Sequence, residues 1–527
     1  MKATKTQVWQ MAGILLWGVL CWAFFQFCYP CHFFYQEQNQ IFLLSSDYLA
    51  GYFSKPAWLA CLAGDFLTQF YYYIYAGAVI LTGVLLVTGD LVRRAMQRAG
   101  LGRGAAYVAA MGVMTLEALF CLSESHRLSS VLCVGGASLL WLLTPRGGKG
   151  FGGRLLGMAA VAVGTLLAHW CFGYGVWLYA ALAMAGAWRQ ARIGELARTA
   201  AATLTVIALL ALTKPVYLLS LDRLYAYPGV GRLAQPAFAL ERLLAVDNAY
   251  YWGHDQRVMA MVEQMPADKR TLQMTFYYNL ASARSGLLAQ NLLKVQPTDL
   301  GIFKRIGPDT PTLEIFRINE VYYLLGDMTF AERAAMMTNV FSPDNRNVRM
   351  MKRLAEANLV NGDMPAAMKY LRLLSNTLAY RQWAEDRMPG RQTKAVREEL
   401  ARKRQFINTR DTLRLTDNAH VMMNELVESN PANEVAINYM LCSDLILKDL
   451  RTFWDDYRRF CLGKGRPRNE TIYQEALLIC LAAQQIPQQE WSRYITRPDV
   501  LRRFMDYNGQ RGSSAFSDTY WYYYDKK

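Results

Sequence analysis

The sequence predicts an all-α protein in which a polytopic bundle of about seven transmembrane helices precedes a polar helical domain. Three observations support this class: long apolar runs before residue 220, Lys and Arg gathered in alternate loops, and amphipathic helical patterns after residue 220. The mean hydropathy is only +0.04 although 53% of the 527 residues are apolar. A very apolar part is therefore joined to a polar part.

Seven apolar runs in the first part are candidates for membrane spans. A helix needs roughly 20 apolar residues to cross the hydrocarbon core. The first three runs and the last run are long enough for this, and the other three are short. The turn at 172–175 is so brief that it predicts a tight helical hairpin, with a re-entrant pair as the alternative. The predicted spans are about 8–28, 66–89, 104–122, 128–143, 155–171, 172–188 and 199–219.

The distribution of Lys and Arg predicts the orientation of these spans. One set of alternate loops holds twelve Lys and Arg, and the opposite set holds only Lys55 and Arg127. The positive-inside rule places the richer set in the cytoplasm. We therefore expect a bacterial inner-membrane protein with a cytoplasmic N-terminus and a periplasmic domain at 221–527. The first run ends in bulky residues without a small-residue cleavage site, so we expect a retained span and not a signal peptide.

The net charge of +15 does not predict a nucleic-acid-binding protein. In the first part, the basic residues occupy short loops between apolar runs, which is typical of membrane proteins. In the second part, charges of both signs alternate along predicted helices and indicate a solvated surface. We expect membrane lipid as a partner and no nucleic acid.

Two segments of the polar part resemble each other. Residues 323–331 and 359–367 both place Gly-Asp after an apolar helical pattern, and Gly326 and Gly362 are 36 residues apart. This spacing is close to the period of roughly 34 residues in a tetratricopeptide (TPR) array. The sequence therefore predicts a degenerate TPR-like array. Such arrays commonly bind a peptide or protein in their groove, so docking of an envelope protein or polymer is expected, with simple packing as the alternative.

The chain closes on the aromatic segment 519–524, Thr-Tyr-Trp-Tyr-Tyr-Tyr. Such a segment suits a membrane interface or a platform on which sugars stack. Burial against the last helices is the favoured interpretation, because Tyr and Trp bury a large area while a polar tip stays hydrogen-bonded.

A few polar residues are candidates for catalysis if the protein is an enzyme, a question that the sequence leaves open. They are Glu37, Asp47, Glu117 and His126. The predicted topology gathers them near the outer leaflet, the first two in the outer loop 30–65. A carboxylate within a span is costly and is a functional candidate by default. A structural pair of Glu117 with His169 or Arg127 is the equal alternative.

The stretch Cys28-Tyr-Pro-Cys31-His32 fits a c-type haem attachment or a redox dithiol. Its predicted location outside the cytoplasm permits both chemistries. However, the pair is expected at a helix C-terminus, where the helix dipole opposes a thiolate, and no methionine lies nearby as a second axial ligand. We therefore expect no cofactor, no metal, and either a structural disulfide or two free thiols.

The sequence is similar to a family of uncharacterised bacterial inner-membrane proteins, a domain of unknown function. The similarity lies in 35–44 (YQEQNQIFLL), in 64–73 (GDFLTQFYYY) and in the closing aromatic segment. It extends over most of the chain. The resemblance implies location and architecture but no activity.

The first hundred residues also resemble the polyprenyl-phosphate-dependent glycosyltransferases of the GT-C fold. The resemblance lies in a long outer loop after the first span, an amphipathic surface segment at 40–49 and an acidic residue. In those enzymes an outer-loop carboxylate helps to bind a metal or activates the acceptor. Only Glu37 or Asp47 could take that place here. The loop lacks an Asp-x-Asp pair and the chain has fewer predicted spans than such enzymes, which leaves the transferase as the alternative function.

Overall fold

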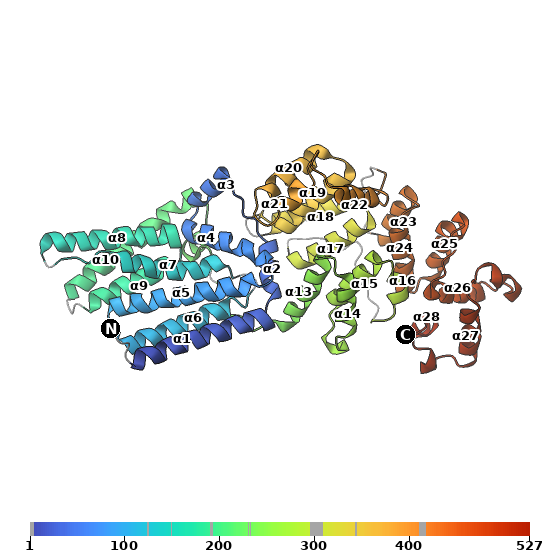
Figure 1. The fold of residues 1–527 in the computed structure, drawn as a ribbon, viewed down its shortest axis with the longest axis horizontal. Coiled ribbons are helices and arrows are strands. Elements are labelled where there is room, and N and C mark those ends of the chain that lie inside the picture. Colours follow the sequence, from blue (N-terminus) through green and yellow to red (C-terminus); the bar gives the residue numbers. More distant parts are fainter. Residues whose placement is uncertain are drawn as a thin grey trace. The chain divides into compact units, whose positions relative to one another are not determined.

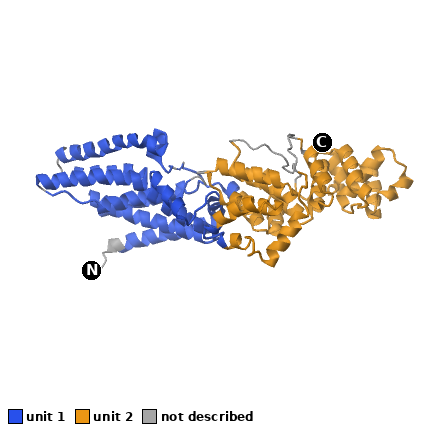
Figure 2. Cartoon of the chain, turned by 90° about the horizontal axis from the view of Figure 1, so that it is seen from above, with its two compact units in different colours: residues 1–241, 375–381 blue, residues 242–374, 382–527 orange. Residues whose placement is uncertain are grey.

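The chain forms two compact helical units. Unit 1 consists of Met1–Glu241 and Ser375–Arg381, and unit 2 of Arg242–Leu374 and Gln382–Lys527 (Figure 2). Helices are the only regular secondary structure among the described residues, which confirms the all-α class. The computed structural model describes residues 5–123, 126–148, 150–189, 193–229, 231, 233–295, 309–342, 345–410 and 418–526.

Unit 1 is a bundle of long helices with shorter ones at one end (Figure 1). α7 is its most enclosed long helix, since it packs against α4, α5, α8 and α9. α4 approaches α7 so closely at Gly64 that an added Cβ would lie 2.7 Å from the backbone nitrogen of Ser129. The helices are α1 (Lys5–Ala23), which continues as a π-helical segment (Phe24–Cys28), α2 (Cys31–Gln38), α3 (Ser46–Ala50), α4 (Trp58–Thr68), α5 (Ala76–Ala99), α6 (Arg103–Phe120), α7 (Leu128–Leu143), α8 (Phe151–Phe172), α9 (Gly175–Trp188), α10 (Ile193–Leu210), α11 (Lys214–Tyr217) and α12 (Leu221–Ala226).

Among the described residues of unit 1, four helical segments are long and apolar enough to cross a membrane. They are Val8–Cys28, Ala76–Ala99, Phe151–Phe172 and Gly194–Tyr217. Large apolar side chains on all four of them remain exposed, for example Leu15 on α1 at 63% and Leu156 on α8 at 62%. Apolar surface of this kind indicates contact with an apolar environment. These helices indicate that unit 1 associates with a membrane.

The remaining predicted spans correspond to shorter or less apolar helices. α7 has 16 residues and α9 has 14, which gives about 24 and 21 Å at 1.5 Å per residue, short of a hydrocarbon core of roughly 30 Å. Helix length and composition therefore support four crossings, and seven crossings stay a prediction from the loop charges. The predicted tight hairpin is present, because only Gly173 and Tyr174 separate α8 from α9.

Two boundaries differ from the predicted ones. The helix expected at 66–89 begins at Ala76, because the preceding residues belong to α4 and to a 3₁₀ turn (Gln69–Tyr72). The domain boundary lies after Glu241 instead of residue 220. The intervening segment stays with the bundle because it is hydrogen-bonded there: Tyr225 donates its hydroxyl proton to the carbonyl of Ile207 at 2.6 Å.

Unit 2 is built from short helices that pack as successive hairpins (Figure 1). α13 (Phe238–Tyr251) leads into it from the bundle. The others are α14 (Asp255–Glu263), α15 (Leu272–Arg284), α16 (Leu288–Asn291), α17 (Thr312–Leu325), α18 (Met328–Phe341), α19 (Val348–Asn361), α20 (Met364–Ser375), α21 (Arg381–Glu385), α22 (Lys394–Arg404), α23 (Ala419–Ser429), α24 (Glu434–Ile446), α25 (Leu450–Phe460), α26 (Thr471–Ala483), α27 (Pro498–Gly509) and α28 (Tyr520–Asp525).

The two similar sequence segments form two similar helix turns. Gly326 and Gly362 end α17 and α19 in the left-handed conformation, with φ of 84° and 82°, which a glycine adopts without steric cost. The following Asp327 then caps α18, since its carboxylate accepts the amide proton of Phe330 at 3.2 Å, and Asp363 does the same for Ala366 at 3.1 Å. Each Gly-Asp pair thus ends one helix and starts the next.

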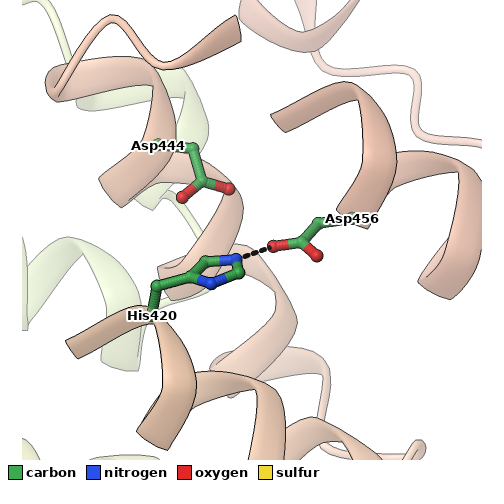
Figure 3. A group of neighbouring side chains, drawn as sticks. All are labelled: His420, Asp444 and Asp456. Atoms are coloured by element: carbon green, nitrogen blue, oxygen red, sulfur yellow. Dashed lines mark hydrogen bonds and ion pairs between the residues drawn. The ribbon is translucent and has the colours of Figure 1, made fainter. Parts of the chain in front are cut away.

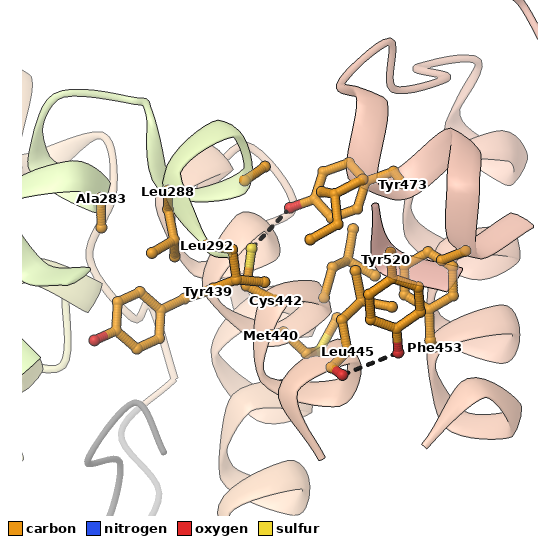
Figure 4. Packing of buried hydrophobic residues seen from close by; sticks show 14 of the residues in the cluster. Ala283, Leu288, Leu292, Tyr439, Met440, Cys442, Leu445, Phe453, Tyr473 and Tyr520 are labelled. Atoms are coloured by element: carbon orange, nitrogen blue, oxygen red, sulfur yellow. Dashed lines mark hydrogen bonds between the residues drawn. The ribbon is translucent and has the colours of Figure 1, made fainter. Parts of the chain in front are cut away.

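The first part of the closing aromatic segment, Thr519 to Trp521, is buried in the core of unit 2, as the favoured interpretation predicted. Figure 4 shows Tyr520 beside Leu445, whose carbonyl accepts the tyrosine hydroxyl at 2.9 Å. Trp521 is 1% exposed and donates its indole proton to the carbonyl of Glu475 at 2.9 Å. Tyr520 and Trp521 therefore close the core with their polar groups hydrogen-bonded.

Replacement of Trp521 by alanine tests this closure. Trp521→Ala removes a fully buried indole and a buried hydrogen bond, so we expect a loss of about 3–5 kcal/mol in the free energy of unfolding. The measurement is denaturant unfolding of the full chain in detergent, monitored by fluorescence. The matched control is Tyr522→Ala, because the neighbouring Tyr522 is only half-buried. Equal losses for the two variants would contradict the assigned packing.

Candidate functional site

Glu117 and His126, two of the predicted catalytic residues, form a buried pair in unit 1. His126 Nε2 lies 3.3 Å from Glu117 Oε2, and the residues are 3% and 5% exposed. The backbone N–H of Gly231 donates to His126 Nδ1 at 3.2 Å. Because Nδ1 accepts this proton, Nε2 carries the imidazole proton and donates it to Glu117. Both ring nitrogens are occupied, and the pair attaches the segment after α12 to the bundle.

Glu37 is buried on α2 beside a segment that comes from much later in the chain. Tyr380 donates its hydroxyl proton to Glu37 Oε2 at 2.9 Å, and each residue is 3% exposed. The backbone confirms this docking, since Leu44 N–H donates to the Asn376 carbonyl at 2.7 Å. Glu37 thus holds Ser375–Arg381 against the first loop of unit 1.

Among the four candidates only Glu117 and His126 form a hydrogen bond with each other, and Asp47 has a different partner. It lies in the first turn of the short helix α3 and is exposed to solvent. A carboxylate at this position is favourable because it faces the positive end of the helix dipole. Its nearest recorded side-chain contact is the hydroxyl of Ser46 at 3.5 Å.

The Cys-x-x-Cys-His stretch bridges two helices. Cys28 ends the π-helical segment, and Cys31 begins α2 instead of lying at a helix C-terminus as expected. Cys28 and Cys31 are not joined by a disulfide in the structure. The ring of His32 is buried between Phe33 and Tyr29, with ring centroids 4.1 and 4.7 Å away. This packing uses His32 as a core residue.

Several arginines of unit 1 line a cavity of about 590 Å³. Arg98 donates to two backbone carbonyls at the end of α7, and Arg154 lies 3.5 Å from Glu195. Among the described residues, Arg146 and Arg189 in the cavity wall have no carboxylate partner. The wall is thus positively charged.

Unit 2 contains a buried ion network that the sequence analysis did not identify. Arg349 donates to both carboxylate oxygens of Asp247 at 2.9 and 3.0 Å and to Glu320 at 3.2 Å. Glu320 also accepts from Arg353 at 2.7 Å. These contacts join α13, α17 and α19. Burial alone would raise the pKa of Glu320, but the charges of Arg353 and Arg349 lower it to about 2.

The network forms one wall of a cavity of about 240 Å³, here called the Lys403 cavity. Its aromatic lining is Tyr250, Tyr251 and Tyr323. Its charged lining consists of Arg284, Arg349, Lys352, Arg353 and Lys403, against Glu320, Glu356 and Glu399. Positive groups therefore outnumber negative ones in the wall.

Lys403 is the cation of this cavity with the poorest electrostatic compensation. Its Nζ lies 3.3 Å from the carbonyl of Leu324 and 4.4 Å from the ring centroid of Tyr323. Among the described residues it has no carboxylate at ion-pair distance. Burial and, next, the charge of Arg353 lower the pKa of Lys403 to about 7. An anionic group that enters the cavity would supply the missing partner.

The sequence contains little signal for this cavity. Arg349, Arg353 and Glu356 recur at helical spacing on one amphipathic helix, and such a pattern is usually a solvated face. Asp247 and Glu320 lie far away in the chain. Only the fold brings the five together, and their burial distinguishes them from surface charges.

A protein-family model matches residues 5–527 of the chain and describes a family of unknown function. The chain belongs to the DUF6057 family. This result confirms the resemblance to an uncharacterised family that the sequence indicated. A search of curated proteins and a search of solved structures found no match.

The lowered pKa of Lys403 makes a chemical prediction. At neutral pH about half of the Lys403 amines are uncharged, because the pKa is about 7, so acetic anhydride should acetylate Lys403 several-fold faster than an ordinary lysine. The control is Lys394 on the same helix, whose side chain is 85% exposed. The measurement is peptide mass spectrometry of the full chain after brief reaction at pH 7. A rate for Lys403 that rises only near pH 10 would contradict the assigned pKa.

Proposed function

We propose that this DUF6057 protein is a multi-pass bacterial inner-membrane protein whose C-terminal unit is a periplasmic docking domain. The unit would act as a TPR-like array that binds an envelope protein or polymer. The observation that carries the proposal is the Lys403 cavity, which combines surplus positive charge with three tyrosine rings. Such a wall is complementary to a carboxylate or similar anionic group on the partner.

The size of the cavity favours docking over capture of a whole small molecule. Its volume of about 240 Å³ lies below the range of roughly 300–1,000 Å³ typical of small-molecule sites. One charged group of a larger partner fits such a space. The guanidinium groups of Arg349 and Arg353 are already fixed by ion pairs, so binding there requires little ordering of side chains.

The location in the envelope is supported by two features of unit 1. Four apolar helical segments are long enough to cross a membrane. Lys and Arg gather in one set of loops, and the positive-inside rule assigns that set to the cytoplasm. The seven crossings predicted from the sequence are an odd number and would place unit 2 outside the cytoplasm, where envelope polymers and proteins are accessible.

A charge-removing substitution at Lys403 tests the docking proposal. The full chain in lipid nanodiscs should bind a fluorescent hexaglutamate peptide, measured by anisotropy, and Lys403→Gln should weaken this binding about tenfold, as expected for loss of one desolvated charge-assisted bond. Binding should also weaken from pH 6 to pH 9, because Lys403 loses its proton as the pH rises through its pKa of about 7.

The matched control is Lys394→Gln, which removes the same charge from the exposed face of the same helix. It should leave binding within about twofold, since an exposed charge contributes little. If the two variants weaken binding equally, the peptide is held by net charge and not by the cavity. That result, or the absence of binding by the wild type, would overturn the proposal.

The second candidate function is a transferase whose site lies in unit 1, at Glu37 and at the Glu117–His126 pair. The observation that favours it is a set of buried carboxylates, Glu37 and Glu117, which is costly in an apolar bundle. Glu37 would take the role of the outer-loop carboxylate in GT-C-like enzymes. Asp47 and His126 belong to the same proposal as its remaining catalytic candidates.

Two substitutions separate catalysis from packing at Glu37. In the transferase, Glu37→Gln should abolish transfer of radiolabelled sugar from a polyprenyl-phosphate donor in membranes that contain the protein. Tyr380→Phe removes only the hydroxyl that Glu37 accepts, so it should leave transfer largely intact. If both variants lower thermal stability alike and no transfer is seen with the wild type, Glu37 has a structural role.

A further inference from the structure

Three polar side chains gather in unit 2 at a place that the Lys403 cavity does not include. His420, Asp444 and Asp456 come from three consecutive helices, α23, α24 and α25 (Figure 3). Each offers one ligand atom, and these atoms all lie within 4.8 Å of one another. His420 Nε2 is 2.8 Å from Asp456 Oδ2. A nitrogen and two carboxylates thus converge from separate helices.

Asp444 has a buried carboxylate oxygen that no hydrogen-bond donor contacts. The residue is 5% exposed, and this oxygen is its Oδ2. Figure 3 shows its carboxylate directed toward the imidazole of His420 and the carboxylate of Asp456. Among the described residues, no Lys or Arg forms an ion pair with Asp444. Burial of an unpaired carboxylate is unfavourable, and coordination of a cation relieves that cost.

We propose that His420, Asp444 and Asp456 bind a divalent transition-metal ion, with Zn²⁺ as the best match. An imidazole with carboxylates suits Zn²⁺, whereas Mg²⁺ and Ca²⁺ prefer oxygen ligands alone. Tetrahedral coordination with bonds of about 2.0–2.1 Å places ligand atoms roughly 3.3 Å apart. The three atoms reach that spacing by small side-chain rotations, because each belongs to a flexible side chain on a rigid helix.

Metal binding would connect the three helices and leave one coordination position open. Three protein ligands occupy three tetrahedral positions, and water takes the fourth, as in zinc sites that are accessible to substrate. The side chain of His420 is 40% exposed, so the ion reaches the site from solvent. Asn424 on the same helix contacts the imidazole, with its Nδ2 2.9 Å from Nε2, and rotates away when that nitrogen binds metal.

Metal content and spectroscopy of the purified full chain test this site. After chelation and dialysis, the wild type should retain one equivalent of added Zn²⁺ per chain and melt at a higher temperature with Zn²⁺ than without it. Co²⁺ in its place should give the intense visible absorption of a tetrahedral site. Asp444→Asn and Asp456→Asn should each weaken Zn²⁺ binding at least about tenfold.

The control is Asp455→Asn, which removes a carboxylate next to Asp456 whose side chain is 57% exposed. It should bind Zn²⁺ like the wild type. Asp444→Asn should fold at least as well as the metal-free wild type, because it replaces a buried carboxyl group whose Oδ2 lacks a partner with a neutral amide of the same size, so its loss of Zn²⁺ cannot be attributed to unfolding. No stoichiometric Zn²⁺ in the wild type, or equal binding by all variants, would overturn the proposal.

Discussion

The guanidinium of Arg349 holds the first half of unit 2 together. It lies 2% exposed between two carboxylates, the 0% exposed Asp247 and the 6% exposed Glu320, and so joins three helices that are far apart in the chain. Loss of one partner from such a cluster leaves a buried charge without a counter-charge and lowers the free energy of unfolding by about 3–5 kcal/mol. The cluster also fixes the wall of the Lys403 cavity, since Arg353 shares Glu320 with it. Structural stability and the proposed binding therefore depend on the same charges.

The part of unit 1 that contains Glu37, His126 and the start of α2 is held by contacts with segments from later in the chain. Tyr380 contacts Glu37, the Gly231 amide contacts His126, and the carboxylate of Glu241 accepts the backbone proton of Cys31 at the start of α2. In each case a polar group that would otherwise be buried alone receives a partner. The candidate residues of this part thus have a structural role, and the transferase proposal must add a chemical one.

Local signals in the sequence were sufficient for much of the architecture. Apolar length predicted the long helices α1, α5, α8 and α10, although α5 begins later than expected because α4 and a 3₁₀ turn use the preceding residues. The Gly-Asp pairs predicted the helix turns at 326 and 362, because a left-handed glycine and an Asp cap are properties of a few adjacent residues. The family resemblance also lay in short segments, at 35–44, 64–73 and 519–524. These features need no knowledge of distant contacts.

The sequence by itself determined the helical class, the apolar first part and the turns, since each follows from the periodicity or conformational preference of neighbouring residues. Only the tertiary structure decided which charges are buried. Arg349 and Lys394 are both basic residues on amphipathic helices, yet one is enclosed by carboxylates and the other is exposed to solvent. Likewise, His420 and Asp456 become neighbours only when α23 packs beside α25. The physical reason is that desolvation and ion pairing depend on distance in space, which residues far apart in the chain acquire only on folding.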